Sequence, residues 1–211
     1  GNTDHAVAVA DEIRQNLEKI NQHGKRADNI VKGMLQHSWA GSGRKEPTDI
    51  NALTEEFLRL TWHGFKAKDD TLNVHIKTEY DETLATGKGK IPVVPQEIGR
   101  VIRNLLSNAF YAVNEKRKEN SEGYEPTVYI STKRTGDKVE IKVRDNGNGI
   151  PKKILKRIFQ PFTTTKPSGQ GTGLGLSLSY DIIVHQHNGQ ISFKTEEGSF
   201  TEFLIQLPSK S

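Results

Sequence analysis

The chain of 211 residues contains no cysteine, one methionine and two tryptophans. Without cysteine there are no disulfides, thiolate metal sites or cysteine nucleophiles, and this absence fits a reducing, cytoplasmic compartment. No apolar run approaches the roughly 20 residues that a membrane span needs, and the first residues show no signal-peptide pattern. We therefore expect a soluble, cytoplasmic chain without membrane contact of its own, although a longer parent protein could be membrane-anchored.

The sequence also lacks a strong excess of charge of either sign. It has 30 Lys and Arg against 26 Asp and Glu, a formal net charge of +4, which is too balanced for a disordered polyelectrolyte. The basic residues are scattered among acidic ones, so we expect no nucleic-acid binding. Hydrophobic residues are only 33% of the chain, so part of it lies outside a core, and the length fits one domain plus an appendage.

The segment from Asp4 to about Gln36 has no proline and predicts one long helix. Apolar or small residues recur four and three apart, which is the spacing of a heptad seam that needs a partner helix. The residues of this seam are Ile13, Leu17, Ile20, Gly24, Ala27, Val31 and Met34. We expect a homodimer through this helix; alternatively, the seam docks on the rest of the chain. Turn-forming residues at 41–47 predict a boundary between a helical region, 1–47, and a domain, 48–211.

The second region alternates helical and strand patterns. Helices are predicted at 49–68, 95–119, 152–157 and 174–187, and strands at 72–76, 91–94, 127–133, 138–144, 190–195 and 200–207. Strands in hairpins mixed with helices predict an α+β fold, a two-layer sandwich with helices on one face of a mixed sheet.

A first cluster with chemical meaning is 145–149, at the end of a predicted strand. The Asp145 carboxylate could accept a hydrogen bond from the amino group of a base, and Gly147 and Gly149 would let the backbone lie against a flat ring. An ordinary Asp-Asn-Gly turn is the alternative interpretation.

A second cluster, 171–176, opens a predicted helix with glycines at every second position. Successive backbone N–H groups there can point at one anion, beside the positive end of the helix. The spacing matches neither the dinucleotide fingerprint nor a Walker loop. The polar stretch 163–170 before it fits a flexible lid over phosphates, and a surface loop without function is the alternative.

A third cluster contains Asn104 and Asn108, which lie four residues apart and so share one face of a helix. A carboxamide oxygen is a hard, neutral ligand of the kind that Mg²⁺ accepts. The two amides could instead satisfy polar groups of the core.

Taken in order, the segments 104–109, 145–149, 159–162 and 171–176 resemble the N, G1, F and G2 boxes of the Bergerat ATP-binding fold. That family includes gyrase, the heat-shock chaperone ATPases, mismatch-repair ATPases and sensor histidine kinases. The sequences at 104–109 and 172–176 most resemble those of the histidine kinases. The resemblance covers about residues 49–208 and implies a Bergerat sandwich that binds ATP and Mg²⁺.

The resemblance implies a role for each matching residue. Asp145 would bind the adenine amino group, Asn108 would ligate Mg²⁺, and Asn104 would lie near the metal and the phosphates. Tyr111 stands where many kinases have a phosphate-contacting lysine, a contact that Lys166 of the lid could supply, so Asn104 and Lys166 are the candidate catalytic residues. The other nucleotide contacts implied are Gly147, Gly149, Gly171, Thr172, Gly173, Leu174, Gly175, Leu176 and Thr201.

The residue at position 104 separates classes of enzyme within the family. Hydrolysing relatives have a glutamate there as the general base for water, and asparagine has no basic carboxylate. The resemblance therefore implies a two-component histidine kinase that transfers the ATP γ-phosphoryl group to a histidine. A non-catalytic nucleotide-sensing dimerisation module and a hydrolysing ATPase remain the alternatives.

The histidine box His-Glu-x-x-Asn/Thr-Pro-Leu, which carries the acceptor in such kinases, is absent from the sequence. Residues 1–47 resemble the second helix of the dimerisation and phosphotransfer hairpin, so we expect the acceptor helix upstream of Gly1. His23 is the best internal substitute, but a solvated helix histidine is the simpler interpretation. The partners implied are that acceptor helix and the receiver domain of a response regulator.

Overall fold

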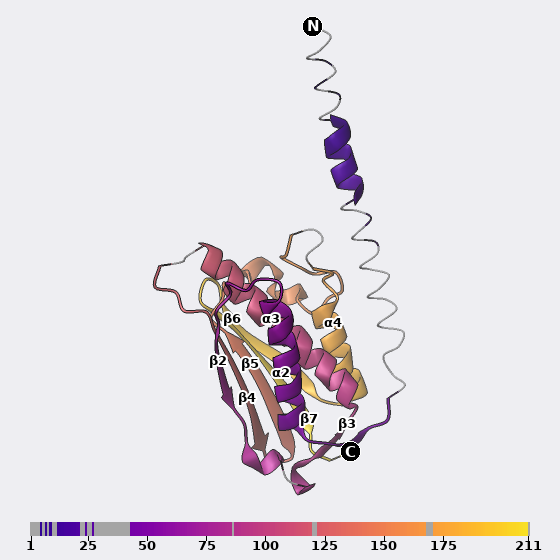
Figure 1. Cartoon of the computed structure of the whole chain (residues 1–211). Coiled ribbons are helices and arrows are strands. Elements are labelled where there is room, and N and C mark those ends of the chain that lie inside the picture. The colour runs from indigo at the N-terminus through magenta and orange to yellow at the C-terminus, as the bar shows by residue number, and fades with distance from the viewer. Residues whose placement is uncertain are drawn as a thin grey trace.

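The computed structural model describes residues 5, 7, 9, 12–21, 24, 27, 43–85, 87–119, 122–167 and 171–210. The described residues between 5 and 27 are helical, and they extend away from the remainder of the chain (Figure 1). Ile13, Leu17 and Ile20 of the expected seam are 54%, 60% and 66% exposed. Val31, Met34 and His23 lie outside the described residues.

Five strands form a mixed sheet in the order β2-β4-β5-β7-β6, with β2 and β4 parallel and the other neighbours antiparallel. They are β2 (His75–Glu79), β4 (Thr127–Thr135), β5 (Lys138–Asp145), β6 (Gln190–Glu196) and β7 (Phe200–Pro208). A separate antiparallel pair consists of β1 (Glu46–Thr48) and β3 (Ile91–Val93). Every second residue of β5 and β7 is buried, so one face of the sheet supplies the core.

Three α-helices cover that face of the sheet (Figure 1). They are α2 (Ile50–Lys66), α3 (Pro95–Glu119) and α4 (Gly175–Tyr180), and the 3₁₀ turns are η1 (Glu82–Leu84), η2 (Gly87–Gly89) and η3 (Lys152–Arg157). Phe110 of α3 is fully buried, and its ring centroid lies 5.4 Å from that of Trp62 and 5.5 Å from that of Phe65 on α2. The predicted two-layer α+β sandwich is confirmed.

Local signals position the two long helices. The Asp49 side chain accepts from the Ala52 N–H at 3.0 Å and so caps α2, as its place before the apolar pattern predicts. Pro95 opens α3, where its missing N–H leaves no intrahelical bond unmade. The strand predicted at 72–76 lies at 75–79 instead, because Leu72 enters the core before β2 begins to pair with β4.

The last predicted helix, 174–187, divides into α4 and a π-helix, η4 (Asp181–Gln186). The His187 N–H donates to the carbonyl of Ile182, five residues earlier, at 3.2 Å. The His187 ring is buried, with Nδ1 2.8 Å from the Ile182 carbonyl and Nε2 accepting from the Val94 N–H at 3.1 Å. Burial lowers the pKa of His187, and the neutral ring joins the end of η4 to the start of α3.

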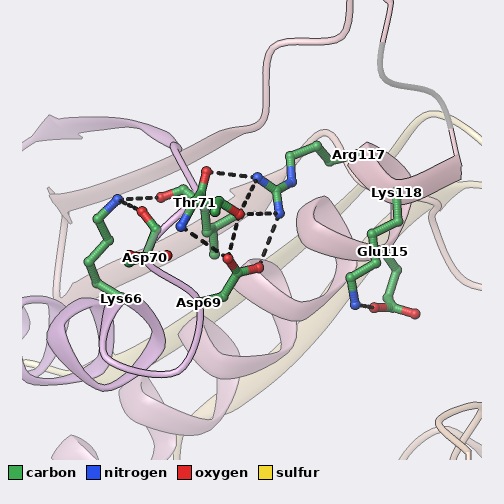
Figure 2. A network of polar contacts seen from close by, with 8 residues as sticks. Lys66, Asp69, Asp70, Thr71, Glu115, Arg117 and Lys118 are labelled. Atoms are coloured by element: carbon green, nitrogen blue, oxygen red, sulfur yellow. Dashed lines mark hydrogen bonds and ion pairs between the residues drawn. The ribbon is translucent and has the colours of Figure 1, made fainter.

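The C-terminal turn of α3 is tied to the loop after α2 by a polar network (Figure 2). Arg117 Nη2 lies 3.1 Å from Asp69 Oδ2, and Arg117 Nη1 donates to the Thr71 carbonyl at 2.8 Å. Lys66 Nζ donates to the carbonyl of Leu72 at 3.0 Å. The Arg117 contacts hold the end of α3 against the loop after α2, and the Lys66 contact fixes that loop to α2.

Candidate functional site

One cavity of about 940 Å³ lies between α3, the turn after β5, the segment 158–167, the start of α4 and β7. Most of the residues singled out in the sequence line it. They are Asn104, Asn108, Tyr111, Asp145, Gly149, Lys166, Gly171, Thr172, Gly173, Gly175, Leu176 and Thr201. Gly147 and Leu174 lie just behind the lining: the Gly147 N–H donates to Asp145, and Leu174 is buried at the start of α4.

Asp145 is the last residue of β5 and is only 6% exposed. It pairs with Val128 of β4 on one side and with Thr201 of β7 on the other, so two strands fix its backbone. Its Oδ1 accepts from the Gly147 N–H at 2.9 Å. The carboxyl group therefore forms part of the cavity wall from a rigid position in the sheet.

The surroundings of Asp145 oppose its ionisation. Burial raises the pKa of Asp145 to about 7, although the N–H groups of Gly147 and Thr201 and the charges of Lys116 and Arg144 act in the other direction. A buried carboxylate gains from a further hydrogen-bond donor because its charge is poorly solvated. A ligand amino group that enters the cavity would be such a donor.

Asn146 fixes the turn that follows Asp145. Its Oδ1 accepts from the Thr127 N–H at 2.8 Å and from the Tyr124 hydroxyl at 2.9 Å, and its Nδ2 donates to the Glu125 carbonyl at 2.9 Å. Lys116 of α3 donates to carbonyls of the same turn. Sequence reasoning missed the roles of Tyr124 and Lys116, because contacts with backbone carbonyls leave no motif.

A second group of residues surrounds Asn108, near the C-terminal end of the N box (104–109). Lys166 Nζ donates to Asn108 Oδ1 at 3.0 Å and lies 4.3 Å from the centroid of the Tyr111 ring. Burial lowers the pKa of Lys166. Lys166, which could supply a phosphate contact in place of Tyr111, thus lies beside both Tyr111 and Asn108, the implied Mg²⁺ ligand. The Asn108 carboxamide oxygen already faces a cation.

Asn104 is packed against the beginning of α4. Its Nδ2 donates to Ser179 Oγ at 2.9 Å, and Ser179 Oγ donates to the Gly175 carbonyl at the same distance. A Cβ on Gly175 would lie 2.1 Å from Asn104 Oδ1, so only glycine allows this approach. The side chain of Asn104 therefore couples α3 to the glycine-rich segment.

Gly173 has φ +68°, a left-handed conformation that favours glycine, and it lies against the backbone of Phe162. Thr163 of the same wall has a buried Oγ1 without a hydrogen-bond partner in the part of the chain that the structure describes.

Apolar side chains form the rest of the wall near Asp145. Ile150, Ile154 and Ile158 come from the segment after the turn, Leu176 from α4 and Phe203 from β7. They suit a flat aromatic ring. Of these five residues, only Leu176 belongs to a motif, because the spacing of the other four is also that of ordinary core residues.

Two features are absent from the described residues: a cluster of metal-ligating side chains and a membrane-spanning helix. No group of three or more His, Asp or Glu side chains there could hold a metal ion by itself, so a metal would need ligand oxygens in addition to Asn108. The helices of that part of the chain include none with the length and apolar character needed to cross a membrane.

Comparison with known proteins is consistent with this geometry. Residues 93–211 match the family described as histidine kinase-, DNA gyrase B-, and HSP90-like ATPase. The sensor histidine kinase ZraS of Salmonella typhi is 32% identical, and the alignment covers 96% of this chain and 45% of that protein. The alginate biosynthesis sensor protein KinB of Pseudomonas aeruginosa is 28% identical over 91% of this chain and 30% of its own length.

A solved structure has the same fold. The catalytic domain of the histidine kinase ThkA, in a nucleotide-free form, superposes with a TM-score of 0.60 at 28% sequence identity. The match covers 79% of this chain and 96% of the ThkA domain. The chain therefore matches a whole catalytic domain, while it spans less than half the length of the two sensor proteins.

Proposed function

Because this chain belongs to the family of histidine kinase-, DNA gyrase B- and HSP90-like ATPases, in its sensor histidine kinase branch, we propose that it binds Mg-ATP in the 940 Å³ cavity. Asp145 accepts from the adenine amino group, and the segment 171–176 holds the phosphates. The observation that carries the proposal is the buried Asp145 at the wall of a cavity whose other wall is the glycine-rich start of α4.

Mg²⁺ would be held by Asn108 together with phosphate oxygens and water. The carboxamide oxygen of Asn108 faces the Lys166 ammonium at 3.0 Å, so the site already accommodates positive charge. Magnesium keeps several waters and commonly uses few protein ligands in nucleotide sites, which a single carboxamide satisfies. When bound, the metal would neutralise charge on the β- and γ-phosphates. Lys166 would then move from Asn108 to the γ-phosphate.

We propose phosphoryl transfer to a histidine as the reaction. Asn104 offers an amide where hydrolysing relatives need a basic carboxylate, and its Nδ2 is engaged with Ser179. Water is therefore not activated from this position, and the γ-phosphoryl group is kept for an imidazole nitrogen, which needs positioning more than activation.

The proposed partners follow from the same function. They are a histidine-bearing helix as phosphoryl acceptor, the receiver domain of a response regulator, and a second copy of this chain that pairs through the exposed seam of Ile13, Leu17 and Ile20. The absence of cysteine supports a reducing, cytoplasmic setting.

Calorimetric titration with a non-hydrolysable ATP analogue, with and without Mg²⁺, tests nucleotide binding. We expect Asp145→Asn to weaken binding by about 2 kcal/mol, roughly thirtyfold, because the buried charged acceptor is lost. Wild-type protein that binds no adenine nucleotide would refute the proposal. Transfer is tested by adding a histidine-bearing helical hairpin and γ-labelled ATP, where the expected product is an acid-labile, base-stable phosphohistidine.

A further inference from the structure

Lys116 lies on the last turns of α3 and contacts three backbone carbonyls from two separate segments. Its Nζ lies 3.0 Å from the Asn146 oxygen, 3.3 Å from the Gly147 oxygen and 2.8 Å from the Gly198 oxygen. Asn146 and Gly147 belong to the turn after β5, and Gly198 belongs to the turn between β6 and β7. One ammonium group thus joins both turns to α3.

Other contacts connect the same two turns. The Gly198 N–H donates to the Asn148 carbonyl at 2.7 Å. The Lys116 ammonium also lies 5.1 Å from the ring centroid of Tyr124, and the Tyr124 hydroxyl donates to Asn146. The cation, the ring and the two turns form one cluster, called the Lys116 clamp below. It stands directly behind the Asp145 end of the cavity.

We propose that Lys116 is a positioning residue for base recognition: its ammonium holds the turn after β5 in the shape that receives adenine, without touching the nucleotide. The inference rests on the proposed function. Lys116 itself does not line the cavity, whereas Asp145, Asn148, Gly149 and Gly198 of the segments around the clamp do. The clamp consists of contacts within the protein alone, so binding would not have to order the turn.

The chemistry of the clamp requires an ammonium. Lys Nζ carries three N–H donors on a compact centre, which matches three carbonyls that converge from different directions. A guanidinium spreads its donors over a planar fork, so Arg cannot reproduce the arrangement. Methionine has a similar length and no donors, so Lys116→Met removes the clamp and leaves most of the side-chain volume.

Neighbouring residues provide matched controls. Lys118 is exposed, lies two residues further along α3 and pairs with Glu115 at 2.7 Å (Figure 2). Lys118→Met therefore removes one positive charge from the same turn without affecting the clamp. Arg117→Met removes the tie from α3 to Asp69 and Thr71 of the loop after α2, and so reports what a loss of anchoring alone does.

The test measures dissociation constants of the full chain for adenosine, ADP and a non-hydrolysable ATP analogue in the wild type and the three variants. We expect Lys116→Met to raise the dissociation constants of all three ligands by the same factor, about tenfold, because the substitution disturbs base recognition only. Lys118→Met and Arg117→Met should stay within a factor of about two of the wild type. Amide hydrogen exchange at Gly147 and Gly198 should accelerate in Lys116→Met alone.

Three outcomes would overturn the inference. In the first, Lys116→Met binds adenosine as the wild type does; in the second, the loss grows with the number of phosphates, as it would for a phosphate counter-charge. In the third, Arg117→Met loses affinity equally, which would make Lys116 a general stabilising residue. If the wild type bound none of the adenine ligands, the proposed function would fail instead.

Discussion

Ionisation of the buried Asp145 has opposite effects on folding stability and on ligand binding. Its folded-state pKa of about 7 lies above the ordinary value of 3.8, so the unfolded chain loses this proton at lower pH than the folded chain does. Rising pH therefore favours unfolding through this group until the pH passes about 7. This loss of folding stability arises at the residue whose ionised carboxylate would accept a hydrogen bond from the amino group of a base.

We predict that Asp145→Asn raises the free energy of unfolding while it weakens nucleotide binding. The gain, about 1–2 kcal/mol at pH 8, should shrink toward pH 5, where the wild-type carboxyl is protonated in the folded state. Denaturant unfolding at the two pH values measures this. A variant less stable than the wild type at pH 8 would contradict the argument.

Ligand affinity should also depend on the ionisation of Asp145, but it should increase as the carboxyl group loses its proton. We predict that the affinity for adenosine, which has no phosphate to titrate, rises from pH 6 to pH 8 and levels off above the Asp145 pKa of about 7. The amino group of the base favours the ionised carboxylate. In Asp145→Asn the residual affinity should be independent of pH over this range, and a sloping profile in that variant would assign the titration to another group.

Lys166 should distinguish ATP from ADP. Its ammonium, from the expected lid, contacts Asn108 and Tyr111 of α3. We predict that Lys166→Met weakens the binding of an ATP analogue about tenfold and that of ADP less than threefold. Lys153→Met, which removes an exposed lysine of η3, serves as the control. Equal losses for ATP and ADP, measured by calorimetry, would show that Lys166 does not reach the γ-phosphate.

At the scale of elements, two glycines in helices should respond oppositely to alanine. A Cβ on Gly64 of α2 meets nothing within 4 Å, whereas a Cβ on Gly175 of α4 would lie 2.1 Å from Asn104 Oδ1. We predict that Gly64→Ala stabilises the protein by about 0.5–1 kcal/mol. Gly175→Ala should destabilise it by about 1–3 kcal/mol.

Gly175→Ala should also weaken nucleotide binding, because it displaces the start of α4. Thermal unfolding and nucleotide titration of both variants measure the two effects. A Gly175→Ala variant with wild-type affinity would mean that the contact between α3 and α4 is not needed to shape the phosphate end of the cavity.

The elements most easily predicted from the sequence are those with local causes. α3 begins at Pro95 and ends at Glu119 as expected, because proline favours the first helical turn and the apolar spacing persists along the helix. Of the two short strands that pair with each other, β3 was predicted and β1 was not. Glu46–Thr48 has no strand pattern, and its pairing with Ile91–Val93 depends on a partner more than 40 residues away.

The cavity was predictable in part for the same reason. Asp145 and the glycines belong to compact motifs, so their neighbourhood could be inferred from order and spacing. The contacts of Lys116, Tyr124 and Ser179 join segments that are far apart in sequence, and they involve backbone carbonyls or a common serine. No local pattern records such partners.

At the scale of the whole molecule, the exposed seam on the N-terminal helix should control self-association. Leu17 is 60% exposed between Ile13 and Ile20, and a helix of this kind gains by pairing its apolar stripe with another. We predict that Leu17→Glu weakens self-association at least about tenfold. Gln15→Glu adds the same charge away from the seam and should leave association unchanged.

Sedimentation velocity over a range of protein concentrations measures this difference. A wild-type chain that stays monomeric at the highest concentration would contradict pairing through the seam. Nucleotide affinity should be the same in both variants, because the described residues that line the cavity all lie between positions 104 and 203.

The π-helix η4 has a consequence for the comparison of this chain with its relatives. The bond from the His187 N–H to the Ile182 carbonyl spans five residues, where an α-helical bond would span four. Compared with an α-helix, the π-helix contains one extra residue between the glycines before α4 and His187, whose ring contacts Val94. A relative with an ordinary α-helix here should align with a single-residue gap between positions 181 and 186, and with no compensating gap on either side.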